Sequence, residues 1–388
     1  MSNEVADANI RGTSSELEVK THQKGLVLGS WAFGTANLII TLVISFLLWY
    51  LLIDPKVSGT NLYPQPFGLF LFWSILAAVF LAFCWEMWPL NRLTQPLKGL
   101  VSVIVGSGIA LIAIFVLGFG YGSMDPAFTL GGPSAPGYTA SGMIVLIGFY
   151  MWGMFAGNWG HWPWRDLKLE QPVVGIGEIL LGLALTLIGY LVLIYPNVAT
   201  WAKQDNVVMP LPMVVGWYYA VIVSCFMTAN ILDNWPWVSL FRSRWTQAIG
   251  SFFGNFILGT GIYWFFLFLL KTWLIPAQVQ IKLGEGINQW PAQLGVTFVF
   301  WVLVWALMFG NYPDTGRAAR DRTIRFVITF VLSLITFVFY TQGFAVGFLH
   351  EPAVSGSFGG DPLTFMDWLI YVMLVYVVYF ESWGLKRR

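Results

Sequence analysis

Charged side chains are scarce in this chain of 388 residues, where Asp, Glu, Lys and Arg make up only 10% of the sequence. Hydrophobic residues make up 57% and aromatic residues 18%, whereas about 25% of the residues of soluble domains are charged. This composition excludes an ordinary soluble protein and predicts the lipid bilayer as a partner. The formal net charge of +1 argues against nucleic acid, because phosphate binding requires clustered Lys and Arg side chains.

Cysteine and histidine are also rare, and their positions exclude several kinds of chemistry. Cys84 and Cys225 lie in apolar runs, as small buried hydrophobes do. His22, His161 and His350 are far apart, and no spacing resembles a zinc, haem or copper site. The sequence has no nucleophile-elbow, P-loop or HExxH motif. We therefore expect no enzyme activity, metal or cofactor, and we expect His161 to be a loop residue without an acid–base role.

Long apolar runs dominate the chain. Crossing the ~30 Å hydrocarbon layer takes roughly 20 apolar residues in a helix, which satisfies its own backbone groups without water. Ten runs approach this length, near residues 27–52, 66–88, 99–120, 141–157, 174–195, 212–232, 247–270, 293–310, 324–346 and 365–383. The fourth and eighth are the shortest. The sequence thus predicts an all-α polytopic integral membrane protein in which residues 26–388 form a single ten-helix transmembrane domain.

Lys and Arg are distributed unequally between the two sides of these spans. The N-terminal segment, the loops after even-numbered spans and the C-terminal segment hold 16 of the 20 basic residues, and the loops after odd-numbered spans hold 4. Because cytoplasmic loops carry the excess of Lys and Arg, both termini are expected in the cytoplasm, with residues 1–25 as a cytoplasmic tail. The first apolar run is too long for a cleaved signal peptide. That feature and the short loops favour a bacterial inner membrane.

An aromatic residue followed by a helix breaker recurs at the predicted cytoplasmic end of each even-numbered span. The pairs are Trp88-Pro89, Trp162-Pro163, Trp235-Pro236, Tyr312-Pro313 and Trp383-Gly384, at spacings of 74, 73, 77 and 71 residues. Regular spacing indicates five tandem parallel two-helix hairpin repeats, roughly residues 26–95, 96–169, 170–244, 245–320 and 321–388. The alternative is an interfacial belt of aromatic residues beside helix-ending prolines. Parallel hairpins could close into a ring or lie in an open row, and a ring leaves no unpaired end.

Carboxylates and amides gather beside these aromatic residues. Glu86, Asp233 and Glu381 each precede the aromatic residue by two positions, and Asn158 and Asn234 lie in the same neighbourhood. A functional interpretation is a cytoplasmic vestibule that attracts a cation or amine by charge and by cation–π contacts. A structural interpretation is a set of interfacial acids paired with nearby arginines, with amides capping helix ends.

Polar residues inside the predicted spans are the remaining candidates for a substrate or ion site, since ionisable groups are costly in lipid. We interpret Glu178, flanked by Gly175 and Gly177, as the only acid well inside a span. It could exchange a proton or bind an amine, or it could simply favour the positive end of its own helix. Asn37 and Asn255 lie beside glycine-rich segments of other odd-numbered spans. If the odd-numbered helices formed an inner ring, these residues would shape one path.

The sequence favours a membrane transporter or channel of the permease type for a small polar organic solute, with an amine or amino-acid-like compound as one candidate. The alternative is a non-catalytic membrane anchor or scaffold subunit of a larger complex. A homo-oligomer or other membrane-complex partners are compatible with both. A transporter requires a cavity near mid-membrane lined by polar groups, whereas an anchor should have a packed interior and an apolar outer groove.

Overall fold

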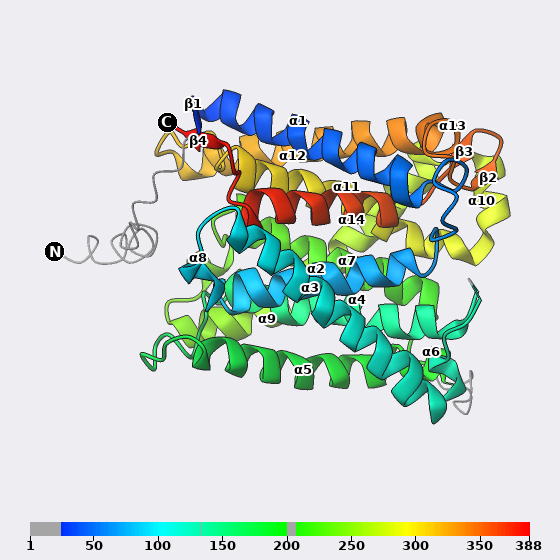
Figure 1. Cartoon of the computed structure of the whole chain (residues 1–388), viewed down its shortest axis with the longest axis horizontal. Helices are drawn as coiled ribbons and strands as arrows, with labels where there is room; N and C mark the ends of the chain where they lie inside the picture. Colours follow the sequence, from blue (N-terminus) through cyan, green and yellow to red (C-terminus); the bar gives the residue numbers. More distant parts are fainter. Residues whose placement is uncertain (1–24, 133, 200–206) are drawn as a thin grey trace.

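The computed structural model describes residues 25–132, 134–199 and 207–388 (Figure 1). Within these ranges ten helical segments are long and apolar enough to cross a membrane. They are Ser30–Ile53, Phe67–Cys84, Leu97–Ser123, Pro136–Ala156, Val173–Leu193, Leu211–Ile231, Arg244–Leu274, Ala277–Met308, Ala318–Gly347 and Pro362–Tyr379. The predicted helical membrane fold is confirmed. The predicted N-terminal tail, apart from its last residue, lies outside the described residues.

The helices fall into odd-numbered and even-numbered spans. The odd-numbered spans contain α1 (Ser30–Leu48), α3 (Leu97–Phe115), α5 (Val173–Leu193), α9 (Arg244–Leu269) and α12 (Ala318–Phe339). The even-numbered spans contain α2 (Phe67–Ala78), α4 (Pro136–Ala156), α7 (Leu211–Phe226), α11 (Trp290–Leu303) and α14 (Pro362–Met373). Many continue into wider π-helical turns: η1 (Trp49–Ile53), η2 (Val79–Cys84), η4 (Val116–Gly120), η8 (Met227–Ile231), η9 (Leu270–Leu274), η11 (Val304–Met308), η12 (Tyr340–Phe344) and η13 (Leu374–Tyr379).

The other elements are short. They are the 3-10 turns η3 (Leu90–Arg92), η5 (Tyr121–Ser123), η6 (Pro126–Phe128) and η10 (Gly284–Gln289), and the helices α6 (Tyr195–Val198), α8 (Trp237–Leu240), α10 (Ala277–Leu283) and α13 (Ala345–Gly347). Strands β2 (Ala353–Ser355) and β3 (Phe358–Gly359) pair antiparallel. The fourth and eighth spans are longer than expected. The fourth helix begins at Pro136, because proline is well suited to the first turn of a helix, and the eighth span includes α10 and η10.

The even-numbered spans form an inner layer and the odd-numbered spans an outer one. Within an apolar 18-residue stretch of each span, 67% to 78% of the residues are buried in the even-numbered spans, against 17% to 44% in the odd-numbered spans. Helix α2 packs against α4, α4 against α7, α7 against α11, α11 against α14, and α14 against α2. The inner helices therefore form a closed ring. The sequence analysis considered an inner ring of odd-numbered helices, but in the structure the even-numbered helices form the inner ring.

Each outer helix packs on the inner helix that precedes it in the chain. Helix α3 packs on α2, α5 on α4, α9 on α7 and α12 on α11, while α1 closes the circle by packing on α14. The start and end of the described chain also meet, because β1 (Leu26–Leu28) pairs in parallel with β4 (Leu385–Arg387). Figure 1 shows α1 and α5 at opposite edges with α2, α7 and α14 between them. We call the side with β1 and β4 the terminal face, and the opposite side the loop face.

Outer helices carry large aliphatic side chains on one face and small or polar ones on the other. In α1, Gly34, Asn37 and Thr41 are buried, whereas Ile39 and Val43 are exposed. Lipid tails are as apolar as these aliphatic side chains, so helix association depends on close packing and interhelical hydrogen bonds. Small residues therefore lie against the inner ring, and aliphatic residues lie where lipid would surround the protein.

Each inner helix ends at the terminal face in the same kind of turn. Two consecutive residues have positive φ, and the amide of the second bonds the carbonyl six positions earlier. These pairs are Glu86-Met87, Gly160-His161, Asp233-Asn234, Gly310-Asn311 and Glu381-Ser382. The turn reverses the chain, and in three cases its first residue forms an ion pair near the start of an outer helix: Glu86 with Arg165, Asp233 with Arg322 and Arg325, and Glu381 with Lys98. The left-handed backbone favours glycine or asparagine at these positions.

Candidate functional site

Glu178 is the sixth residue of α5, and its side chain is fully buried. Its Oε1 atom lies 2.9 Å from Nδ1 of His161, in the turn after α4. Its Oε2 atom has no hydrogen-bond partner in the described parts of the chain. The thiol of Cys84, at the end of η2, lies beside the same carboxylate. The structure thus places the sequence-predicted acid in a buried polar pocket formed by two inner helix ends.

His161 connects this buried carboxylate to the protein surface. Its Nε2 atom lies 3.7 Å from Oε1 of Glu86. Glu86 in turn forms an ion pair with Arg165 and accepts a hydrogen bond from Gln171 at 3.1 Å. Side-chain exposure rises from 0% at Glu178 to 16% at His161 and 39% at Glu86. Titratable groups therefore line a path from the interior to the terminal face. The sequence did not indicate this role for His161, because its partners are brought together only by the fold.

The glycines beside Glu178 contact indole rings. A Cβ atom added at Gly175 would lie 1.6 Å from Cδ1 of Trp85, and one added at Gly177 would lie 2.1 Å from Nε1 of Trp164. Both tryptophans belong to the chain segments that follow inner helices. Gly175 and Gly177 thus allow α5 to approach the inner ring closely.

Asn255 of α9 belongs to a buried hydrogen-bond network with the two inner helices it faces. Its Nδ2 atom donates to Oδ1 of Asn158 at 3.0 Å, and its Oδ1 atom accepts from Ser224 at 2.8 Å. Asn158 also donates to Thr228 at 3.0 Å and to Oδ1 of Asn234 at 2.8 Å. The fold thus joins three of the sequence-predicted candidates, and their mutual hydrogen bonds compensate for burial of the amides.

Asn37 of α1 is also fully buried. Its Nδ2 atom donates to the carbonyl of Phe33 at 2.9 Å, and its Oδ1 atom has no hydrogen-bond partner among the residues that the structure describes. Each of the five outer helices carries a fully buried polar side chain: Asn37, Ser102, Glu178, Asn255 and Thr329.

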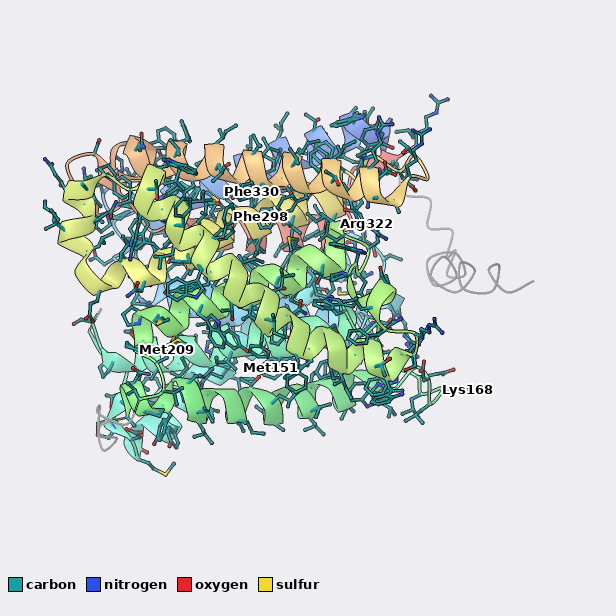
Figure 2. The ribbon with its side chains drawn as sticks, turned by 180° about the vertical axis from the view of Figure 1, so that it is seen from behind. Met151, Lys168, Met209, Phe298, Arg322 and Phe330 are labelled. Atoms are coloured by element: carbon teal, nitrogen blue, oxygen red, sulfur yellow. The ribbon has the colours of Figure 1, made fainter. Side chains whose placement is uncertain are left out.

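The acids proposed for a vestibule form separate ion pairs. Asp233 pairs with Arg325 at 3.0 Å and with Arg322 at 3.2 Å, and Glu381 pairs with Lys98. Glu86 pairs with Arg165, as described above. Figure 2 shows Arg322 at the terminal face with Lys168. The fold therefore distributes these acids over junctions between inner and outer helices, and their charges are partly neutralised.

A cavity of about 20 Å³ lies between four of the five inner helices, and it is large enough for about one water molecule. It is lined by Phe72, Gly142, Met143, Val145, Leu146, Phe149, Val215, Tyr219, Leu363 and Asp367. Asp367 is only 4% exposed. It is the sixth residue of α14, about 7 Å along the helix from its start. The interpretation of Glu178 as the only acid well inside a span was therefore wrong.

Two further carboxylates lie where α14 begins, at the loop face. Asp361 accepts hydrogen bonds from Gln293 at 3.0 Å and from Thr364 at 2.6 Å. Glu351 accepts from the Tyr340 hydroxyl at 2.6 Å and from the amide of Asp361 at 2.8 Å. Burial raises the pKa of Glu351 from its ordinary value of 4.5 to about 8, and the charge of Asp361 raises it further while the Tyr340 hydrogen bond opposes the shift. Two acids therefore lie at the loop-face end of α14, and Glu351 is mostly protonated at neutral pH.

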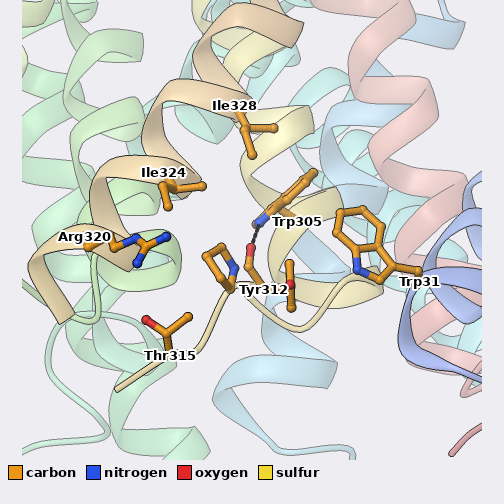
Figure 3. Close-up of a pocket in the computed structure, with 8 residues that line it drawn as sticks. Trp31, Trp305, Tyr312, Thr315, Arg320, Ile324 and Ile328 are labelled. Carbon is orange, nitrogen blue, oxygen red and sulfur yellow. Dashed lines mark hydrogen bonds between the residues drawn. The ribbon is translucent and has the colours of Figure 1, made fainter. Parts of the chain in front are cut away.

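A larger groove of about 240 Å³ lies outside the ring, near the terminal face (Figure 3). It is lined by Trp31, Trp305, Tyr312, Pro313, Thr315, Arg320, Ile324 and Ile328. The indole of Trp305 donates to the carbonyl of Tyr312, which fixes the turn at one wall of the groove. The lining is mostly apolar, with Arg320 as its charged residue.

No protein family, curated protein or solved structure matches this chain. Within the described ranges, no group of three or more His, Cys, Asp or Glu side chains could hold a metal ion. Cys84 and Cys225 are both buried and free. Function is therefore inferred from the geometry of the buried carboxylates and of the ring.

Proposed function

We propose that this protein is a membrane transporter or channel for a small polar organic solute, with amines and amino-acid-like compounds as the candidates. The observation that carries the proposal is the Asp367 carboxylate, which faces a cavity inside a closed ring of helices. No hydrogen bond or ion pair joins it to another described residue. A carboxylate held inside a membrane span without a partner is costly and indicates a functional role.

For a transporter, a cavity of this size would correspond to a conformation that does not yet admit the solute. A volume of about 20 Å³ accommodates roughly one water molecule, and an organic solute needs more space. Passage of a solute therefore requires movement of the inner helices relative to one another. Helix movements of this kind occur on microsecond to millisecond timescales.

We infer that five tandem parallel hairpins form the ring, as the sequence spacing predicted. Supporting features are the same two-residue left-handed turn at the end of each inner helix and the regular packing of each outer helix on the preceding inner helix. The Lys and Arg distribution supports a cytoplasmic terminal face. The short loops and the long first apolar run favour a bacterial inner membrane as the location. Glu178, His161 and Glu86 would then connect the interior to the cytoplasm, with Glu178 as a protonatable coupling group.

A membrane anchor or scaffold subunit is the second candidate function. The inner helices pack against one another, and the groove beside Trp31 and Trp305 provides an apolar recess on the outer surface. Both features match the alternative that the sequence left open. A scaffold, however, does not require an unpaired carboxylate inside the ring.

Uptake into proteoliposomes separates the two functions. The purified protein should accumulate one class among radiolabelled amines, amino acids and organic acids above the level of protein-free liposomes. Asp367→Asn, which preserves the shape but removes the charge, should reduce this uptake at least tenfold at equal incorporation. If no class is accumulated and the protein copurifies with a fixed membrane partner, the scaffold function is correct.

A further inference from the structure

The cavity in the inner ring has an unusual combination of lining groups. One carboxylate, Asp367, is accompanied by the aromatic rings of Phe72, Phe149 and Tyr219, and the other lining residues are aliphatic, glycine or methionine. The Tyr219 hydroxyl is the other oxygen-bearing side-chain group in the lining. The site therefore combines one carboxyl group with aromatic rings and is poor in oxygen ligands.

This chemistry discriminates between classes of ligand. An anion would be repelled by Asp367. Metal cations need a shell of oxygen ligands to replace their water, as in carbonyl-lined filters or in six- to eight-coordinate sites, and the cavity lining supplies only the oxygens of two side chains. An ammonium group needs fewer oxygens, because aromatic faces attract it and a single carboxylate neutralises it. Its size is also close to that of a water molecule.

We propose that this cavity binds a small ammonium-type cation, either ammonium itself or the protonated headgroup of a short primary amine. Asp367 is the charge partner, Phe72 and Phe149 provide cation–π faces, and the Tyr219 hydroxyl accepts a hydrogen bond. This inference deepens the proposed transport function by naming the solute class. The headgroup fits the cavity of about 20 Å³, while a carbon substituent requires movement of the inner helices.

The surroundings of Asp367 favour entry of a cation from the loop face. Asp361 lies at the start of the same helix and is close enough to interact electrostatically with Asp367. Tyr219, which lines the same cavity, is also close enough to interact electrostatically with Asp367. A negative potential at the mouth raises the local concentration of cations. Its effect on the rate of entry should decrease as ionic strength rises.

Direct binding measurements on the purified full-length protein test the inference without requiring transport. In nanodiscs, methylammonium should bind saturably by calorimetry, ammonium should compete, and sodium or potassium at the same concentration should not. Asp367→Asn should weaken methylammonium binding at least tenfold. Glu285→Gln removes a carboxylate exposed at the loop face, away from the cavity lining, and should bind like the wild type.

A second variant tests the site independently in case Asp367→Asn does not fold. Phe149→Leu keeps an apolar side chain but removes one aromatic face, so methylammonium affinity should fall several-fold while the melting temperature remains close to that of the wild type. Absence of saturable binding by the folded wild type, equal competition by sodium, or unchanged affinity in a folded Asp367→Asn variant would overturn the inference. Saturable binding without uptake would retain the site but remove the transport function. Uptake of a non-amine without methylammonium binding would support the transport function but rule out the ammonium site.

Discussion

The Nδ1 atom of His161 lies 2.9 Å from Oε1 of Glu178, 17 positions later in the chain. This contact joins the turn after an inner helix to the sixth residue of an outer helix. His161 also faces the half-exposed Glu86 at 3.7 Å. Any change in the protonation of Glu178 would therefore alter the electrostatic environment of two groups closer to the surface.

Glu178→Gln should keep the fold and remove the pH dependence of uptake. Glutamine preserves the shape and can still hydrogen-bond to His161, but it cannot exchange a proton. Uptake into proteoliposomes measured across a series of pH values checks this expectation. Glu170→Gln, which changes an exposed acid at the same face, provides the matched control. An unchanged pH profile in the Glu178 variant would contradict a coupling role.

Gly175→Ala should destabilise the protein by about 1–3 kcal/mol, as overpacking of a filled site does. The added Cβ atom would lie 1.6 Å from the Trp85 ring, so α5 or the indole must move. Gly108→Ala in α3 meets no atom within 4 Å and should be neutral or stabilising by up to about 1 kcal/mol. Thermal unfolding of both variants in the same detergent would compare their stabilities. Equal stability of the two would show that α5 does not require this close approach.

Stability should decrease as pH rises toward 8 because of Glu351. Its folded-state pKa is about 8 against an ordinary 4.5. Its contribution to the free energy of unfolding is therefore complete below about pH 4.5 and is lost as pH rises through 8. Between these values the free energy of unfolding should fall by up to about 1.4 kcal/mol per pH unit. Glu351→Gln should flatten this dependence, which thermal unfolding at several pH values would measure. The exposed Glu285→Gln variant should retain the wild-type slope.

The terminal face should be cytoplasmic. In intact cells, Ser134→Cys should react with an impermeant thiol reagent, and Ala318→Cys should not, because the two exposed positions lie at opposite ends of the spans. Both native cysteines are buried, so the background should be low. Labelling of the Ala318 variant from outside, with no labelling of the Ser134 variant, would reverse the orientation.

The location of both intramembrane acids illustrates where sequence reasoning succeeded and where it failed. Glu178 was recognised because apolar residues and glycines surround it on both sides. Asp367 was missed because the predicted span began at residue 365, which placed the acid in its first turn. The helix begins at Pro362, which moves Asp367 one turn and a half inside. Helix ends are the least reliable part of a hydropathy pattern.

The sequence by itself determined ten membrane spans, because every backbone group in lipid must be satisfied within a helix and only long apolar runs can provide that. Tertiary structure decided which helices form the inner ring, that α1 packs on α14, and that His161 meets Glu178. Hydropathy carries no signal for these choices. In a bilayer both the lipid-facing and the buried surfaces are apolar, so position is determined by close packing of small residues and by interhelical hydrogen bonds.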